Sequence, residues 1–172
     1  WPACIVLAVT ACAAKHNHTH SRSFSRRWAN RLLDVWLTLL TGTSTTGIRL
    51  PHQARHHRRN QSPADFVRCD LVAGRSPLGA LLVFVPRVIV ETWRRRADAP
   101  SAQRTARRRA CRTERAALWL LIVGALLVDW RAFLLTFPVP WLASQWFLLA
   151  INLPQHDGCD PTSRWAHSRD AL

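Results

Sequence analysis

Long apolar runs alternate along this chain with segments rich in arginine, and this segregation limits the folds open to it. Hydrophobic residues make up 48% of the 172 residues, while 24 basic residues stand against 10 acidic ones. Uncharged apolar runs favour burial in a bilayer, and arginine-rich segments stay outside its hydrocarbon core. The pattern predicts an all-α, integral membrane protein, with a histidine-rich region on its cytoplasmic side.

The runs divide the chain into six predicted segments. These are the end of a membrane helix (1–14), a region with two histidine clusters (15–70), an interfacial helix (78–90), a basic cytoplasmic loop (91–115), two antiparallel membrane helices (116–153) and a polar tail (154–172). The polar break Asp129-Trp130-Arg131 is predicted at or near the turn between the two membrane helices. The apolar stretch 32–40 contains Asp34 and is too short to span a membrane, so it either lies against the membrane or packs on its neighbours.

The arginines also predict the orientation. The block at 94–115 is expected on the cytoplasmic side, because positive charge is retained there. The chain then crosses outward after Arg115 and returns by Leu153. All the histidine clusters are therefore predicted on one face, as a shared metal site requires.

All 8 histidines fall in tight clusters, and imidazole is a common ligand of iron, copper and zinc. Helical residues four apart project from one face, which favours His16 with His20 and His52 with His56 as ligand pairs. His57 is turned by about 100° from His56 and aims at a neighbouring point. A further candidate pair is His156 with Asn152, four residues before it. His18 is expected to be solvated and to point away from the site. The role of His167 is left open.

These spacings resemble the membrane fatty acid desaturase/hydroxylase superfamily. His16–His20 matches its first box, H-x-x-x-H, and His52–His56–His57 matches its second, H-x(2,3)-H-H. The following Asn60, Pro63 and Asp65 resemble bacterial members. The segment from Asn152 to His156 resembles an N-x-x-x-H element that supplies one histidine ligand and a water-linked asparagine.

The resemblance implies a centre of two non-haem irons, with six ligands in this chain: His16, His20, His52, His56, His57 and His156. Molecular oxygen would be the co-substrate and an acyl lipid or acyl carrier the substrate. An external ferredoxin or cytochrome b5-like protein would supply electrons. Lipid, alkane and carotenoid hydroxylases of the superfamily have the same histidine boxes. The boxes therefore leave open whether the reaction is a desaturation or a hydroxylation.

The superfamily's third box, H/Q-x(2,3)-H-H, is not found before Leu172, and the chain begins at Trp1 without any methionine. We therefore expect a fragment or an inactive truncated remnant, without activity as an isolated 172-residue chain. The formal charge of +14 raises the possibility of nucleic-acid binding. The arginines flank apolar spans instead, so anionic lipid headgroups are the expected partner and nucleic acid is not.

Overall fold

The computed structural model is helical throughout the part of the chain that it describes. It describes residues 1–51, 61–63, 65–94, 105, 108, 109, 111–156 and 159, with the backbone alone for Leu50, Pro51, Trp93, Asn152 and Gln155. The chain forms two compact units. Unit 1 comprises residues 1–50 and 100–145, unit 2 comprises residues 51–99 and 146–172, and each is treated by itself below.

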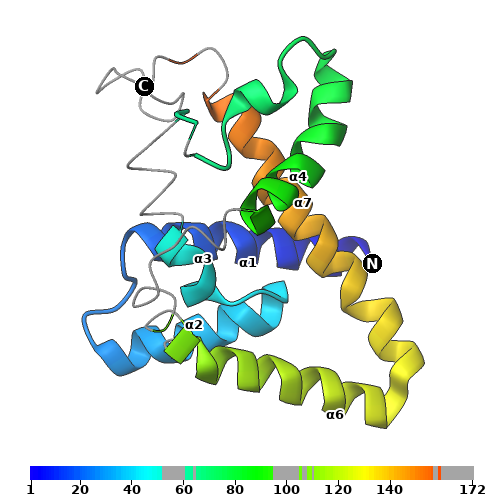
Figure 1. Ribbon diagram of the computed structural model, residues 1–172. Coiled ribbons are helices and arrows are strands. Elements are labelled where there is room, and N and C mark those ends of the chain that lie inside the picture. The colour runs from blue at the N-terminus through cyan, green and yellow to red at the C-terminus, as the bar shows by residue number, and fades with distance from the viewer. Residues whose placement is uncertain are drawn as a thin grey trace. The chain divides into compact units, whose positions relative to one another are not determined.

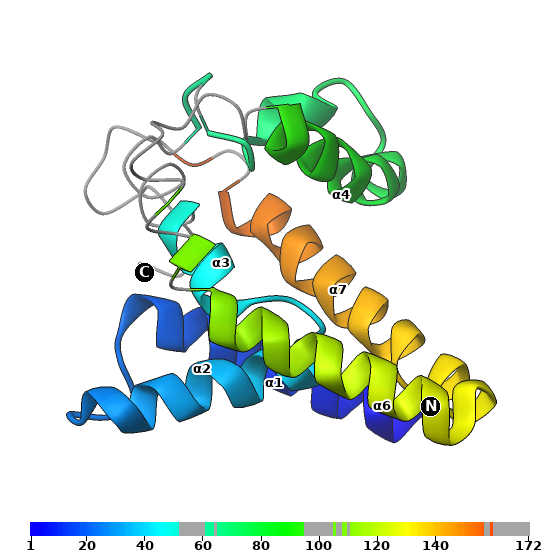
Figure 2. The same ribbon diagram turned by 60° about the horizontal axis from the view of Figure 1, so that its bottom comes forward.

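Unit 1 is built on α1 (Pro2–His20), α2 (Arg27–Thr41) and α6 (Arg112–Thr136). Helix α2 contacts both α1 and the first turns of α6 (Figures 1 and 2). Pro2 occupies the first turn of α1, where its missing N–H leaves no bond unmade. Gly42 ends α2 in the left-handed conformation, with φ 67°, and a Cβ there would lie 2.5 Å from the ring of Trp141. Glycine therefore meets both a conformational and a packing requirement at this turn.

The short helix α3 (Thr45–Pro51) follows that turn, and α7 (Pro138–His156) follows α6. The chain bends sharply at Asp129, within the predicted break 129–131, where the φ of −157° and ψ of 95° separate two helical segments of α6. The Asp129 Oδ1 accepts hydrogen bonds from the backbone N–H groups of Arg131 (3.0 Å) and Ala132 (2.9 Å), so it caps the helical turns that follow. Phe137, between α6 and α7, keeps helical dihedrals, and its N–H donates to Phe133 O at 3.0 Å, so the second segment continues into α7.

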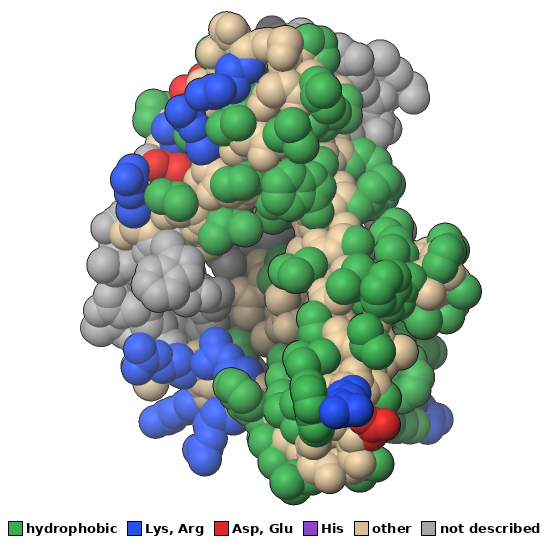
Figure 3. Space-filling model, turned by 90° about the vertical axis from the view of Figure 1, so that its right-hand side faces the viewer, with side chains coloured by type: hydrophobic (Ala, Val, Ile, Leu, Met, Phe, Trp, Pro, Cys, Tyr) green, Lys and Arg blue, Asp and Glu red, His purple; other side chains and the backbone are tan. Residues whose placement is uncertain are grey.

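Of the two predicted membrane helices, α6 alone is long and apolar enough to cross a bilayer among the described residues. Its helical segment before the break at Asp129, residues 112–128, comprises 17 residues, or about 26 Å. The apolar part of α7, Pro138–Ile151, is shorter than α6. Figure 3 shows how densely hydrophobic side chains cover the surface that α6 and α7 present. Trp119, Trp130 and Trp146 are exposed there, as expected of interface anchors, whereas Trp141 packs on Phe133 and Phe137.

Unit 2 contains the 3-10 helix η2 (Cys69–Val72), α4 (Pro77–Arg94) and the end of α7. Its core gathers apolar side chains from all three, together with the loop before η2: Val67, Leu71, Val72, Ala80, Phe84, Val88 and Leu153. Helix α4 is longer than the predicted 78–90 and continues through Pro86. The predicted basic loop 91–115 is helical up to Arg94 and again from Arg112.

Candidate metal centre and its supporting polar network

The last turns of α1 bring two predicted ligands together. His16 is half-buried and His20 is exposed, and their Nε2 atoms lie 3.1 Å apart. The imidazole centroids are 4.6 Å apart, with the ring planes at 58°. The four-residue spacing on a continuous helix produces this convergence, as the sequence pattern indicates.

The two Nε2 atoms form a hydrogen bond, and their separation can be compared with that of two ligands on one ion. Two nitrogens each about 2.1 Å from a metal, at an angle of about 90–110°, would be separated by about 3.0–3.4 Å. The separation of 3.1 Å falls in that range. The donor set of His16 and His20 therefore fits a metal that prefers imidazole nitrogen. Within the described ranges, no three His, Cys, Asp or Glu side chains are grouped as a complete metal site.

His18 points to a different part of the unit, and the expectation that it is solvated is wrong. Its side chain is 1% exposed. Nε2 accepts a hydrogen bond from Arg22 Nη1 at 2.7 Å, and the same Nη1 donates to Asp34 Oδ1 at 2.8 Å. Nδ1 lies 2.8 Å from Ser23 Oγ and accepts a hydrogen bond from Ser23 N at 3.2 Å. Burial lowers the pKa of His18, and Asp34 opposes that shift.

Lys15, one residue before the first predicted ligand, is also buried. Its ammonium donates to Thr41 Oγ1 (2.9 Å), Thr43 Oγ1 (2.7 Å) and Thr43 O (2.5 Å). These bonds tie α1 to the turn after α2. Burial lowers the pKa of Lys15 to about 8. A sequence signal existed, because Lys15 continues the small-residue stripe of Ala8, Ala11 and Cys12 at helical spacing.

Glu114 is a second buried charge, and it lay in the predicted basic loop. It is 3% exposed in the first turn of α6. Its Oε2 accepts hydrogen bonds from Ser44 Oγ (2.7 Å), Thr46 N (3.0 Å) and Thr38 Oγ1 (3.2 Å), and its Oε1 accepts one from Thr46 Oγ1. One carboxylate thus joins α6 to α2 and α3. The only signal in the sequence was an acid within the arginine-rich part of that loop, residues 104–115.

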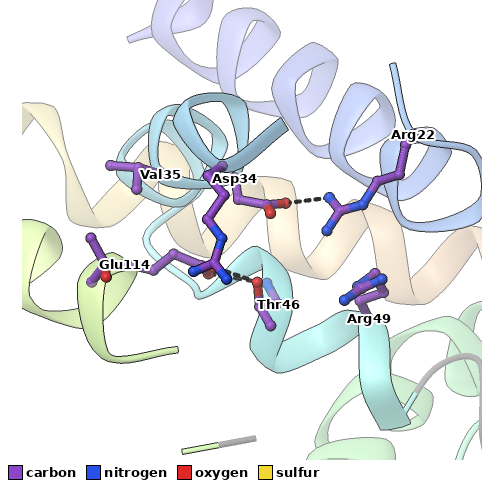
Figure 4. A pocket seen from close by; sticks show the side chains of 8 residues that line it. Arg22, Asp34, Val35, Thr46, Arg49 and Glu114 are labelled. Atoms are coloured by element: carbon purple, nitrogen blue, oxygen red, sulfur yellow. Dashed lines mark hydrogen bonds and ion pairs between the residues drawn. The ribbon is translucent and has the colours of Figure 1, made fainter. Parts of the chain in front are cut away.

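A polar pocket of about 100 Å³ opens between these groups (Figure 4). Asp34 and Glu114 line it, but both carboxylates are engaged by the bonds described above. Arg49 also lines it, and its buried Nε has no hydrogen-bond partner among the described residues. Burial, reinforced by the nearby Arg22, lowers the pKa of Arg49. Among the residues that line the pocket, arginines therefore outnumber carboxylates.

The other predicted ligands are less completely placed. His156 is buried at the last residue of α7, in unit 2. Asn152 occupies the preceding turn of the same helix, as its spacing predicts, and its side chain is outside the description. His52, His56, His57 and His167 lie outside the described residues. The convergence of all six ligands stays a prediction.

Asp65 contributes a feature that the motifs did not reveal. Its side chain is fully buried just after the second histidine cluster. Oδ2 accepts a hydrogen bond from Gln61 N (3.0 Å), and Oδ1 accepts one from Val67 N (2.9 Å). One carboxylate thus closes the loop that leads from the second cluster into the core of unit 2.

Comparison with known proteins gives one match. A family model described as Fatty acid desaturase matches residues 1–171. Neither the curated proteins nor the solved structures contain a significant match to the chain.

Proposed function

The chain belongs to the fatty acid desaturase family, and from this membership we propose that it is part of a membrane enzyme that dehydrogenates acyl chains with molecular oxygen. The family is membrane-bound, acts on lipids and is generally dependent on two irons and oxygen. The single observation that carries the proposal to this chain is the 3.1 Å approach of the His16 and His20 Nε2 atoms.

We assign the iron ligands to the histidines of the three clusters: His16, His20, His52, His56, His57 and His156. Asn152 would act on a ligand through a bound water. Iron, when bound, supplies the oxygen activation needed to remove hydrogen from an unactivated acyl chain. The electrons would arrive from a ferredoxin or a cytochrome b5-like protein, and the site would face the cytoplasm.

The protein's own part is to hold its ligands rigidly. His16 directly follows Lys15, and His20 lies about one turn further along α1. The Lys15 ammonium fixes α1 against the turn after α2. On the same buried face of α1, three residues beyond Lys15, hydrogen bonds through His18, Arg22 and Asp34 fix the end of the helix. Ligands placed on such a supported helix keep their geometry better than ligands on a loop.

The test measures iron in the purified 172-residue chain, in detergent, by elemental analysis and Mössbauer spectroscopy. His16→Ala and His20→Ala are each expected to lower iron per folded chain and to alter the spectrum. Asn17→Ala is the matched control, because Asn17 is exposed between the two ligands. Unchanged iron in both histidine variants would remove the first cluster from the metal site.

Reaction type is tested separately, by gas chromatography of the fatty acids of a host that expresses the chain within its natural protein. A monounsaturated product that disappears in His56→Ala and His57→Ala supports the proposal. A hydroxylated product would assign the chain to the hydroxylases of the superfamily instead. A natural protein without either product would support the inactive-remnant alternative.

A further inference from the structure

Helix α2 has its polar side turned inward and its apolar side turned outward. The residues that it buries are mostly polar: Asn30, Asp34, Leu37, Thr38 and Thr41. Large apolar side chains, spaced four residues apart on the opposite side, are exposed: Trp28, Leu32, Trp36 and Leu40. A helix on the surface of a water-soluble protein has the reverse arrangement. We call these four exposed residues the α2 stripe.

Hydrogen bonds hold this orientation in place. Asn30 Nδ2 donates to Phe24 O at 2.6 Å, and Asp34 accepts from Arg22 at 2.8 Å. Thr41 accepts from the Lys15 ammonium at 2.9 Å. Turning the α2 stripe inward would break these bonds and leave the buried Lys15 ammonium without its Thr41 acceptor. The stripe therefore faces whatever medium surrounds unit 1.

We propose that α2 is an interfacial helix whose stripe lies in the acyl chains at the membrane boundary. This inference rests on the membrane location in the proposed function. Exposed charge is confined to one end of the helix, where Arg27, Arg31 and the N-cap residue Arg26 suit anionic headgroups. The two tryptophans of the stripe have the amphipathic rings that favour the interface.

The contact with α6 sets the level of α2 relative to the membrane boundary. Arg112 and Arg115 are exposed at the start of α6, where a spanning helix leaves the hydrocarbon. In that same turn Glu114 accepts a hydrogen bond from Thr38, in the C-terminal half of α2, at 3.2 Å. Helix α2 therefore lies at the level of the headgroups and does not continue across. Its 15 residues, about 22 Å, are in any case too few to span a core of ~30 Å.

Lipid suits the stripe better than another helix does. Close helix contacts in membranes favour small residues, which let the backbones approach. The stripe presents tryptophan and leucine instead. An interfacial α2 also leaves the chain on one side of the membrane between His20 and the start of the second histidine cluster, which a shared metal site needs.

The experiment places the photoreactive residue p-benzoylphenylalanine at Leu32 or at Trp36 of the complete 172-residue chain. The protein is reconstituted in nanodiscs of phosphatidylcholine and phosphatidylglycerol that carry a clickable acyl chain. Leu127, an exposed residue of α6, serves as the lipid-facing reference, and the exposed Ser21, in the loop before α2, serves as the polar reference.

We expect lipid adducts at positions 32 and 36 in yields similar to position 127, and severalfold above position 21. Dimer adducts, internal adducts or no adducts at 32 and 36, together with lipid adducts at 127, would overturn the interfacial helix while the membrane location stands. Absence of lipid adducts at 127 as well would overturn the membrane location itself.

Discussion

Replacing Glu114 should destabilise unit 1 more than any other single change to its polar network. In Glu114→Ala, the Thr46 N–H cannot reorient, and the hydroxyls of Ser44 and Thr46 lose their acceptor. Thr38 keeps a partner, since its Oγ1 also lies 2.7 Å from Asp34 O. Three donors are thus left in a buried environment.

The magnitude follows from that count. Each unsatisfied buried donor costs about 1–3 kcal/mol, and the loss of the carboxylate's own desolvation penalty offsets part of the sum. We expect Glu114→Ala to lower the free energy of unfolding by about 3–5 kcal/mol. For a chain of this size that corresponds to a fall in Tm of about 6–20 °C. Glu114→Gln keeps one acceptor oxygen and should lose about half as much.

The assay is thermal unfolding in one detergent, followed by intrinsic tryptophan fluorescence. Arg115→Ala is the matched control, because Arg115 is exposed one residue further along α6 and should change stability by less than about 0.5 kcal/mol. A Glu114→Ala melting curve that overlays the Arg115→Ala curve would refute the reasoning, since the carboxylate would then not be the shared acceptor.

Three other substitutions test residues that are expected to support the fold without binding the metal. Lys15→Met leaves Thr43 O with only the long 3.5 Å bond from Thr41 Oγ1 and should cost about 1–3 kcal/mol in the same melting assay, less than Glu114→Ala. His18→Ala should lower Tm yet leave iron per folded chain unchanged, because His18 is bonded to Arg22 and does not belong to the ligand pair. A loss of iron would make it a ligand. Asp65→Ala should accelerate amide hydrogen exchange in the loop 61–67, and unchanged exchange would contradict its role as the cap of that loop.

Patterns local in sequence predicted part of this structure. The four-residue spacing of His16 and His20 was enough, because one helix determines their convergence. The burial of Lys15 and Glu114 was not predicted. Glu114 meets α2 and α3 through contacts about 70 residues distant in sequence, and no local signal reports such partners.

The polar break Asp129-Trp130-Arg131 was also predictable from a local pattern. Charged residues interrupt the apolar run there, and the chain bends sharply at Asp129, whose carboxylate caps the helical segment that follows. Pro138 does not end that segment, because Phe137 before it keeps helical dihedrals and proline is tolerated in the first turn of a helix.

The kink at Asp129 also bears on bilayer thickness. The uncharged part of α6 before it, residues 116–128, comprises 13 residues, or about 20 Å of helix. An ordinary hydrocarbon core measures ~30 Å. With Asp129 and Arg131 exposed, the helix is shorter than that core and must thin the lipid around it or draw on snorkelling arginines at its first turn. Hydrophobic mismatch would therefore favour short-chain lipids as the environment of this protein.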